Sequence, residues 1–263
     1  MLTFIVICML VGCIVGFLAG LFGIGGGMVV VPVLVYLLPM VNVPNELLMN
    51  MALGTSFATI VITGAASAYN HHQRGNMQWS VLKTLLPSII ISVFIASHFI
   101  SRLPKEYSSK LFAVLVVYLA IKMILSIKPK AQNKSFTTQS SIIGGALIGI
   151  ASSIAGIGGG SFIVPFLNSR GVEMKKAIGT SSFCGMFLAI SGMLSYMQSG
   201  WQVENLPDYA LGYVYLPAVL GITITSFFTT KLGVATTSKL PVASLKRYFA
   251  LLLIVIAVKM IFD

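Results

Sequence analysis

The sequence predicts an all-α polytopic membrane protein of about eight to ten membrane segments, arranged as two inverted structural repeats. The 263-residue chain is 57% hydrophobic and only 9% charged, with a mean hydropathy of +0.95, whereas soluble domains carry about 25% charged residues. Its charged residues are confined to short stretches between continuous apolar runs of about twenty residues, the length of a membrane-spanning helix. Such runs exclude a β-barrel, whose strands alternate apolar and polar residues. The repeats are predicted by a motif that occurs once in each half of the chain.

The apolar runs define the expected segments in chain order. They fall at residues 3–22, 27–40, 47–70, 79–101, 108–127, 139–157, 160–168, 175–199, 208–232 and 244–262. A polar stretch, 128–138, separates the fifth run from the sixth. We interpret it as a cytoplasmic linker between an N-terminal transmembrane repeat (1–127) and a C-terminal transmembrane repeat (139–263).

The repeated motif is a glycine cluster followed by a valine-proline pair. Residues 23–34 and 156–167 share eight of twelve positions, including Gly-Ile-Gly-Gly-Gly and Val-Pro. At 1.5 Å per residue, the apolar runs 27–38 and 160–168 make helices of only about 18 Å and 13 Å, against a hydrocarbon core of about 30 Å. Each half is therefore expected to open with a helical hairpin, in which a long helix, a glycine turn inside the membrane and a short returning helix follow one another. A single interrupted crossing is the alternative.

Other motifs recur in the same order. Ala-x-Gly-Thr-Ser occurs at 52–56 and 177–181, and Lys-Met-Ile occurs at 122–124 and 259–261. One motif can recur by chance in apolar sequence, but several in the same order indicate duplication. Lys122 and Lys259 stand close to segment ends and are interpreted as snorkelling to the membrane interface.

The distribution of loop charge predicts the orientation. With a hairpin in each half, most loop Lys and Arg fall on one side of the membrane, and only Arg102, Lys105 and Lys110 fall on the other. The richer side is expected to be cytoplasmic. An odd number of segments per half then makes the two repeats inverted relative to each other.

The two glycine clusters are the predicted substrate site. A turn inside the membrane leaves amides unpaired at a cost of several kcal/mol each, so it must be buried in protein, line a cavity or hold a ligand. The N-terminus of each following short helix carries free N–H groups and a partial positive charge, which suit an anion. Close helix packing through small residues is the alternative interpretation. The candidate residues are Gly23, Gly25, Gly26, Gly27, Gly156, Gly158, Gly159 and Gly160.

Hydroxyl groups follow each glycine cluster. Thr55, Ser56, Thr180 and Ser181 are candidate donors to substrate oxygens, unless their hydroxyls bond to carbonyls of their own helices. A further polar group at two segment ends is interpreted either as an interfacial belt or as a gate that includes titratable histidines. Its members are Tyr69, Asn70, His71, His72, Tyr196 and Gln198, with Tyr69 paired to Tyr196 in the repeat.

Several functions are excluded by what the sequence lacks. No carboxylate falls in the middle of a segment, which argues against a cation substrate. The net charge of +11 is attributed to topology-setting loops and not to nucleic-acid binding. Cys8, Cys13 and Cys184 show no metal-ligand spacing. Without nucleotide-binding, metal or catalytic motifs, the chain is predicted to be no enzyme and to use no cofactor or metal.

The duplicated Gly-Ile-Gly-Gly-Gly-x-x-x-Val-Pro cluster and the Ala-x-Gly-Thr-Ser elements resemble the sulfite exporter TauE/SafE family, over essentially the whole chain. The resemblance implies an integral membrane permease for sulfite and sulfonates, often described as an exporter. It also implies that both glycine clusters and the four Thr and Ser residues contact the substrate.

The expected function is secondary transport in a prokaryotic plasma membrane by a multi-pass protein. Small sulfur-containing anions such as sulfite or organosulfonates are the expected substrates, exported by alternating access and bound between the two glycine turns. The lipid bilayer and the anion are the expected partners, and the sequence predicts no oligomeric state. A passive channel for a small anion or a neutral solute is the alternative.

Overall fold

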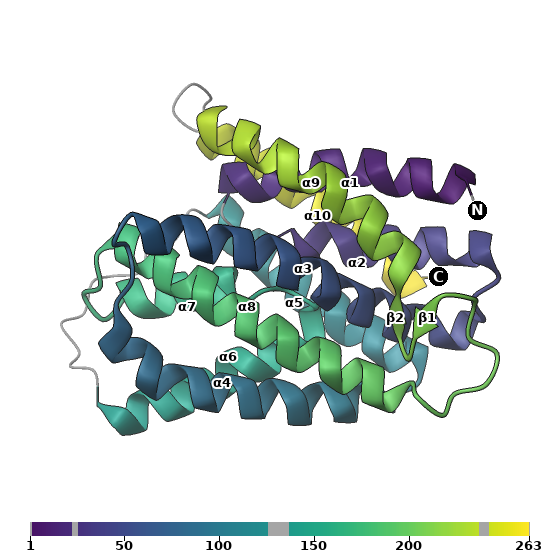
Figure 1. The fold of residues 1–263 in the computed structure, drawn as a ribbon, viewed down its shortest axis with the longest axis horizontal. Coiled ribbons are helices and arrows are strands. Elements are labelled where there is room, and N and C mark those ends of the chain that lie inside the picture. The colour runs from purple at the N-terminus through teal and green to yellow at the C-terminus, as the bar shows by residue number, and fades with distance from the viewer. Residues whose placement is uncertain (1, 23–25, 126–136, 237–241, 263) are drawn as a thin grey trace.

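The computed structural model describes residues 2–22, 26–125, 137–236 and 242–262. Helices account for nearly all of this part of the chain, and the two short strands form one antiparallel hairpin (Figure 1). In chain order the elements are α1 (Leu2–Phe22), α2 (Gly27–Leu37), η1 (Leu38–Val41), η2 (Asn45–Leu47), α3 (Leu48–Gln73), α4 (Trp79–Ile100), α5 (Lys105–Ile124), α6 (Thr138–Ala155), α7 (Gly160–Asn168), α8 (Met174–Ser199), β1 (Ala210–Leu211), β2 (Val214–Tyr215), α9 (Leu216–Thr236) and α10 (Val242–Phe262).

Five helical segments in the described residues are long and apolar enough to cross a membrane. They are α4, α5, α6, α8 and the continuous stretch Asn45–Gln73, which contains α3. Shorter apolar stretches lie in α1, α2 with η1, α9 and α10. The all-α polytopic membrane class is therefore confirmed, whereas the inverted repeats and their boundaries stay predictions. Most of the expected linker, residues 128–136, lies outside the described residues.

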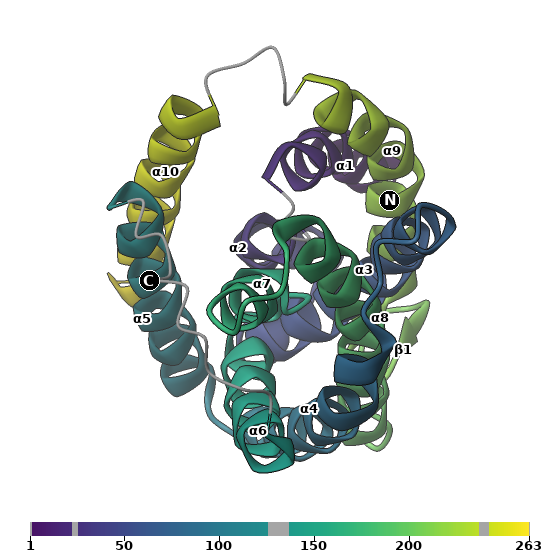
Figure 2. The same cartoon turned by 90° about the vertical axis from the view of Figure 1, so that its left-hand side faces the viewer.

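The helices run roughly along the long axis of the bundle, and both chain termini lie at the same end of it (Figure 1). We call this end the terminal end, and we call the end where α3 leads into α4 the α3–α4 end. Figure 2 looks along the bundle from the α3–α4 end. The two short helices α2 and α7 lie near the middle of this view, with α5 and α10 on one side and α3 and α8 on the other.

Ordinary local signals set several helix starts. The Thr137 hydroxyl accepts a hydrogen bond from the Ser140 amide at 3.2 Å and so caps the start of α6. Pro104 precedes α5, and Glu106 in the first turn of α5 lies near the positive end of the helix dipole. These starts agree with the expected segments to within a few residues.

A close pair of parallel helices, α1 and α9, joins the beginning of the chain to its last third. Gly12 and Gly16 face α9, where an added Cβ would overlap Ile222 at the first position and would lie 2.5 Å from the Ser226 carbonyl oxygen at the second. The absence of side chains at these two positions lets the backbones touch, as in small-x-x-x-small packing of membrane helices.

The helices α4 and α6 are also packed closely through two glycines. Gly145 and Gly149 of α6 face α4, where added Cβ atoms would lie 3.0 Å and 3.1 Å from the carbonyl oxygens of Leu85 and Ile89. Each close pair therefore joins a helix from the first half of the chain to one from the second half. The halves are intertwined and do not form two separate bodies.

One expected segment is wrong at its start. The run 208–232 was expected to be apolar helix throughout, but α9 begins only at Leu216. The preceding residues form the β1–β2 hairpin, because Tyr209 and Gly212 adopt left-handed backbone angles (φ 66° and 54°) that a right-handed helix does not contain. Hydropathy did not detect this hairpin because its residues are themselves largely apolar.

Candidate functional site

Each short helix begins at a glycine with left-handed backbone angles. Gly26 precedes α2 with φ 72° and ψ −21°, and Gly159 precedes α7 with φ 73° and ψ −14°. Glycine adopts these angles at no steric cost because it has no Cβ. The two predicted positions therefore have nearly the same backbone geometry. Gly23 and Gly25, two further predicted site residues, lie outside the described residues.

The two ends of the α1–α2 unit lie where a hairpin would place them. Near the start of α1, the Phe4 ring lies 5.5 Å from the Tyr215 ring, beside the β1–β2 hairpin at the terminal end (Figure 1). The short helix α2 leads to Asn45, whose side-chain oxygen accepts a 2.6 Å hydrogen bond from the Lys105 ammonium at that same end. The start of α1 and the end of α2 therefore lie at one end of the bundle, which is the arrangement that the predicted hairpin requires.

The second half shows the same arrangement at the opposite end. The helix α6 runs parallel to α4, so it starts at the α3–α4 end, where α4 also starts. The short helix α7 then leads into α8, whose Thr180 hydroxyl accepts a hydrogen bond from the Gln78 amide just before α4. Both ends of the α6–α7 unit therefore lie at the α3–α4 end.

The two glycine regions meet in the interior. A Cβ added to Gly27 would overlap the Gly156 carbonyl oxygen. The Ser56 hydroxyl donates a 2.9 Å hydrogen bond to this same oxygen, and Ile60 contacts the positions of both Gly27 and Gly158. Ser56 and Ile60 lie near the middle of the 26-residue helix α3. Three predicted site residues, Gly27, Gly156 and Ser56, are therefore brought together halfway along the bundle.

Gly158 and Gly159 line the same junction from the other side. A Cβ added to Gly185, near the middle of α8, would overlap the Gly158 carbonyl oxygen, and one added to Gly159 would lie 2.9 Å from Leu188. The junction is therefore enclosed by the midpoints of α3 and α8. Gly192 lets α8 approach the Phe57 ring of α3 closely, and sequence reasoning missed Gly185 and Gly192 because isolated glycines in apolar helices carry no motif.

The starts of both short helices offer backbone donors. The amides of Val29 and Val30 both bond to the Gly26 carbonyl, and those of Phe162 and Ile163 both bond to the Gly159 carbonyl. The preceding amides, at 27–28 and 160–161, have no backbone acceptor among the described residues. Free N–H groups at a helix start carry the positive end of the helix dipole.

Three serine hydroxyls near α7 have no hydrogen-bond partner within the described residues. They belong to Ser152, one turn before Gly156, to Ser161, directly after Gly160, and to the predicted site residue Ser181. Ser152 and Ser181 are 0% and 2% exposed. Sequence reasoning missed Ser152 and Ser161, although their positions beside the glycine cluster were a usable signal. A buried hydroxyl without a partner is costly, so these groups are available to a ligand.

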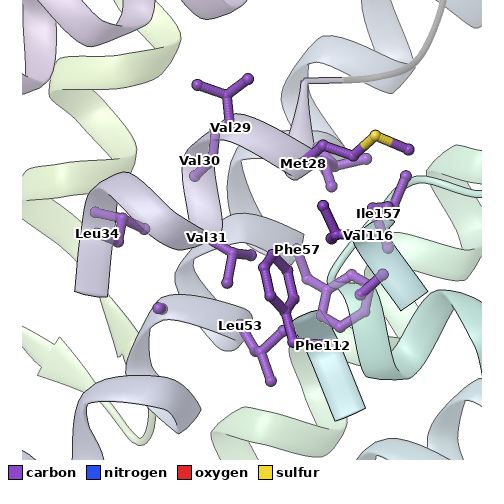
Figure 3. Close-up of a cluster of buried hydrophobic side chains, with 14 of the residues drawn as sticks. Met28, Val29, Val30, Val31, Leu34, Leu53, Phe57, Phe112, Val116 and Ile157 are labelled. Atoms are coloured by element: carbon purple, nitrogen blue, oxygen red, sulfur yellow. The ribbon is translucent and has the colours of Figure 1, made fainter. Parts of the chain in front are cut away.

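Apolar side chains cover the terminal-end side of the junction. Figure 3 shows Met28 and Val31 of α2 packed with Leu53 and Phe57 of α3 and with Ile157 of the second glycine cluster. Met28 holds the place in the first motif that Ser161 holds in the second, and the Ser56 hydroxyl, unlike that of Ser181, is bonded to the Gly156 carbonyl. The junction is therefore polar toward α7 and apolar toward α2.

Thr55 and Thr180 each make a contact that the sequence did not predict. The Thr55 hydroxyl accepts a 3.0 Å hydrogen bond from the Tyr215 amide just before α9, and the Thr180 hydroxyl accepts one of 3.0 Å from the Gln78 amide just before α4. Both threonines are completely buried. We call these two contacts the threonine clamps. They hold the starts of α9 and α4, and contact of the threonines with substrate stays a prediction.

The predicted gate residues divide between the two ends. Tyr69 is 63% exposed and accepts a hydrogen bond from Gln73, which fits the interfacial alternative. Asn70, His72 and Gln198 are also exposed. Tyr196 is instead completely buried at the terminal end, its hydroxyl has no partner among the described residues, and its ring lies 6.0 Å from that of Phe57.

The register of the uninterrupted helices pairs Tyr196 with His71, whereas the sequence comparison paired it with Tyr69. Aligning Ala52–Ser56 with Ala177–Ser181 along α3 and α8 gives this result. Matching contacts agree with it, because the Asn76 amide bonds to the His71 carbonyl at 3.0 Å and the Tyr213 amide bonds to the Tyr196 carbonyl at 3.3 Å. Burial raises the pKa of the Tyr213 phenol, so this group is neutral beside Tyr196.

Anionic groups are remote from the junction. The described carboxylates, Glu46, Glu106, Glu173, Glu204 and Asp208, are all exposed. No group of three His, Cys, Asp or Glu side chains in the described residues is arranged to hold a metal ion. An anion at the junction would therefore meet backbone amides and hydroxyls without a repelling carboxylate.

Comparisons with known proteins agree on one family. The family model described as Sulfite exporter TauE/SafE matches residues 8–260. A Haemophilus influenzae protein with the printed name "Probable membrane transporter protein" is 64% identical over 99% of both chains. Proteins similarly named as membrane transporters are 29% identical in Methanocaldococcus jannaschii (88% of this chain, 85% of that protein) and 26% identical in Bacillus subtilis (98% and 97%).

No solved structure matches the chain. The family match covers nearly the whole sequence, and it includes both glycine turns, both short helices and the helices that enclose them. This multi-pass integral membrane protein is a transporter and not an enzyme, and it belongs to the sulfite exporter TauE/SafE family.

Proposed function

We propose that this protein is a secondary transporter that exports small sulfur-containing anions, such as sulfite or organosulfonates, and binds them at the junction of the two glycine turns. The observation that carries the proposal is the meeting of Gly27 and Gly156 at the middle of α3 and α8, beside two helix starts. The family description points to the same class of substrate.

The chemistry of the junction suits an oxyanion. A sulfite or sulfonate group is compact and rich in hydrogen-bond acceptors, and it needs donors from several directions. The amides at the starts of α2 and α7, which have no backbone acceptor among the described residues, supply backbone donors, and Ser152, Ser161 and Ser181 supply hydroxyls. Each helix start contributes roughly 0.3–2 kcal/mol of electrostatic stabilisation to an anion, so no buried lysine or arginine is required.

Two inverted repeats are part of the proposal. The α1–α9 pair corresponds to the α6–α4 pair in both direction and glycine spacing. The clamp from Thr55 to the Tyr215 amide corresponds to the clamp from Thr180 to the Gln78 amide. The antiparallel contact of α3 with α8 supports a twofold relation between the halves.

Loop charge supports a cytoplasmic position for the α3–α4 end. Arg74, Lys175, Lys176 and Lys231 lie there among the described residues, and Arg102, Lys105 and Lys110 lie at the terminal end. Export of a monoanion then needs no coupled ion, because an inside-negative potential contributes about 2.3 kcal/mol per charge per 100 mV.

Alternating access explains the tight junction better than a passive channel does. A channel needs a continuous path, but Gly27 packs directly on the Gly156 carbonyl, and apolar side chains cover the junction toward the terminal end (Figure 3). An anion can pass such a site only if the packing around it changes during the cycle.

Transport by the purified protein tests the proposal. Proteoliposomes are offered labelled sulfite, thiosulfate, a short alkanesulfonate or a carboxylate under an imposed membrane potential, and saturable movement of at least one sulfur anion is expected. Ser181→Ala is expected to raise KM about ten- to hundred-fold, the loss that about 1.5–3 kcal/mol for a hydrogen bond to a charged group represents. It should leave thermal stability unchanged, because the Ser181 hydroxyl has no internal partner among the described residues.

Ser153→Ala is the matched control for Ser181→Ala. The Ser153 hydroxyl donates a 2.8 Å hydrogen bond to the Gly149 carbonyl, so its loss changes stability and not KM. If Ser181→Ala leaves KM unchanged, the Ser181 hydroxyl does not contact the substrate. An absence of saturable transport for every sulfur anion would reject the proposed substrate class.

A further inference from the structure

The two short helices occupy corresponding positions but differ in burial. Eight residues of α2 are buried, from Gly27 to Val35, whereas only Ile163 and Leu167 are buried in α7. Two helices in equivalent positions should be buried by the rest of the protein to the same extent. On the inverted-repeat arrangement proposed above, the difference therefore reports different packing at the two ends of the bundle.

The long helix α3 shows the same difference along its own length. Its residues 48–60, toward the terminal end, are all buried, whereas residues 61–67, toward the α3–α4 end, are all at least partly exposed, with Ile62 the most exposed at 42%. The buried Tyr196 at the terminal end and the partly exposed His71 at the other follow this pattern. Among the described residues, the bundle is therefore more closely packed at the terminal end than at the α3–α4 end.

Contacts of the short helices explain the difference. At the terminal end α10 packs against α2, whereas among the described residues α5 has at most marginal contact with α7. The helices α5 and α10 carry the repeated Lys-Met-Ile motif and pack against each other. They are therefore corresponding helices, of which α10 covers α2, whereas α5 leaves α7 uncovered among the described residues.

The lysines of this motif have different partners. Lys259 of α10 places its ammonium 4.6 Å from the centre of the Tyr36 ring of α2. Its neighbour Met260 lines a pocket of about 280 Å³ with Tyr36, Asn45 and Lys105. Lys122 of α5 instead lies 5.9 Å from the ring of Tyr118, one turn earlier on its own helix. The terminal end thus has a lysine that joins two helices, whereas the ring contact of the lysine at the α3–α4 end, among the described residues, lies within its own helix.

We propose that Lys259 and Lys122 are equivalent gate residues, each of which closes one mouth of the transport path when it packs on the short helix at its end. In the described conformation Lys259 holds the terminal mouth closed on Tyr36, and Lys122 has left α7, so the opposite mouth is open. In the alternate conformation Lys122 packs on α7 and Lys259 leaves Tyr36.

The energy of the contact suits a gate. An exposed ammonium over an aromatic ring contributes about 0.5–1 kcal/mol, which holds the mouth closed without trapping it. Once released, an ammonium at the mouth also attracts an arriving anion and stabilises the open form, because a ligand shifts a conformational equilibrium by its preference for one state. This step rests on the proposed anion substrate, but the gate itself does not.

Cysteine accessibility tests the gate without any substrate. Val31 of α2 and Val164 of α7 are corresponding residues of the two Val-Pro pairs; Val31 is 0% exposed and Val164 is partly exposed. Val31→Cys and Val164→Cys are made in a Cys13→Ser background, which keeps the buried Cys8 and Cys184 as a measured blank. A membrane-impermeant maleimide is expected to label Val164→Cys in one vesicle orientation only and to leave Val31→Cys nearly unlabelled.

Releasing the terminal gate should reverse this pattern in part. Lys259→Gln is expected to raise the labelling rate of Val31→Cys about two- to five-fold, from the opposite face of the vesicle, and to lower that of Val164→Cys. Lys259→Arg keeps a cation over Tyr36 and should restore protection. Lys110→Gln, which removes an exposed lysine at the same end, is the charge control and should change neither rate.

Two results would overturn the gate. Equal labelling of Val31→Cys and Val164→Cys in protein that retains Lys259 would show that the two ends of the bundle do not differ in access. Unchanged labelling of Val31→Cys after Lys259→Gln, in protein that still elutes as a single species in detergent, would remove Lys259 from the gate. Neither result bears on which anion is carried, and a failure of sulfur-anion transport leaves the labelling pattern unaffected.

Discussion

Gly27→Ala is expected to lower transport about a hundred-fold, because the added methyl group would meet the second glycine turn. The added Cβ would overlap the Gly156 carbonyl oxygen and lie 3.1 Å from the Gly156 neighbour Ile157. Neither neighbour is the flexible end of a side chain, so α2 must move away from the second glycine turn. A displacement of about 1 Å in a binding constellation costs about a hundred-fold in rate.

Gly64→Ala is the matched control for Gly27→Ala. Gly64 also lies in a central helix, but its added Cβ would be 3.4 Å from the nearest atom of Met186, an ordinary contact distance. Alanine is favoured over glycine by roughly 0.5–1 kcal/mol inside a helix, so transport and thermal stability should be unchanged or slightly raised. The rates are measured in proteoliposomes at equal reconstituted protein. Normal transport by Gly27→Ala would show that the contact of the two turns is not part of the path.

Thr55→Val is expected to lower the melting temperature by roughly 3–10 °C and to leave the KM of the folded protein unchanged. Valine matches threonine in shape but removes the acceptor of the Tyr215 amide. That amide would be left buried and unpaired at a cost of about 1–3 kcal/mol, which corresponds to a shift of this size in a chain of this length. Thr180→Val should behave alike, because the Gln78 amide loses its acceptor.

The serine variants separate the two interpretations of the threonine hydroxyls. Thr55→Ser and Thr180→Ser retain an acceptor and should recover most of the lost stability. Melting is followed in detergent by a thiol-independent method such as light scattering, and KM is followed in proteoliposomes. If Thr55→Val instead raises KM at an unchanged melting temperature, the hydroxyl contacts substrate and the threonine clamp is secondary.

Local sequence patterns were enough to predict the helical class and the special positions of the short helices. Hydropathy over about twenty residues reports burial in lipid or protein directly, and the absence of side chains at Gly26 and Gly159 permits the left-handed angles that begin α2 and α7. The short length of these helices also follows from sequence, because about 18 Å is less than a core of about 30 Å, but the sequence allowed either a hairpin or an interrupted crossing.

Partners distant in the chain were not predictable. Hydropathy is nearly the same all round helices that are buried or face lipid, so it does not indicate that α1 packs on α9 or α6 on α4. The sequence offered two partners for the Thr55 hydroxyl, a substrate oxygen or a carbonyl of its own helix, and only the fold brings the Tyr215 amide to it. The sequence comparison paired Tyr196 with Tyr69 because both are tyrosines. Because α3 and α8 are uninterrupted helices, their register from the Ala-x-Gly-Thr-Ser motifs pairs Tyr196 with His71 instead.

The sequence by itself determined that this is a helical membrane protein with two glycine turns, each followed by a helix too short to cross, because lipid burial and backbone freedom depend on residues close together in the chain. Only the tertiary structure decided that the two turns touch, that Thr55 and Thr180 hold distant helix starts, and that α2 is buried while α7 is not. These features depend on which helix faces meet across the bundle. That choice arises from packing among segments up to two hundred residues apart, for which apolar residues of similar size leave no local signal.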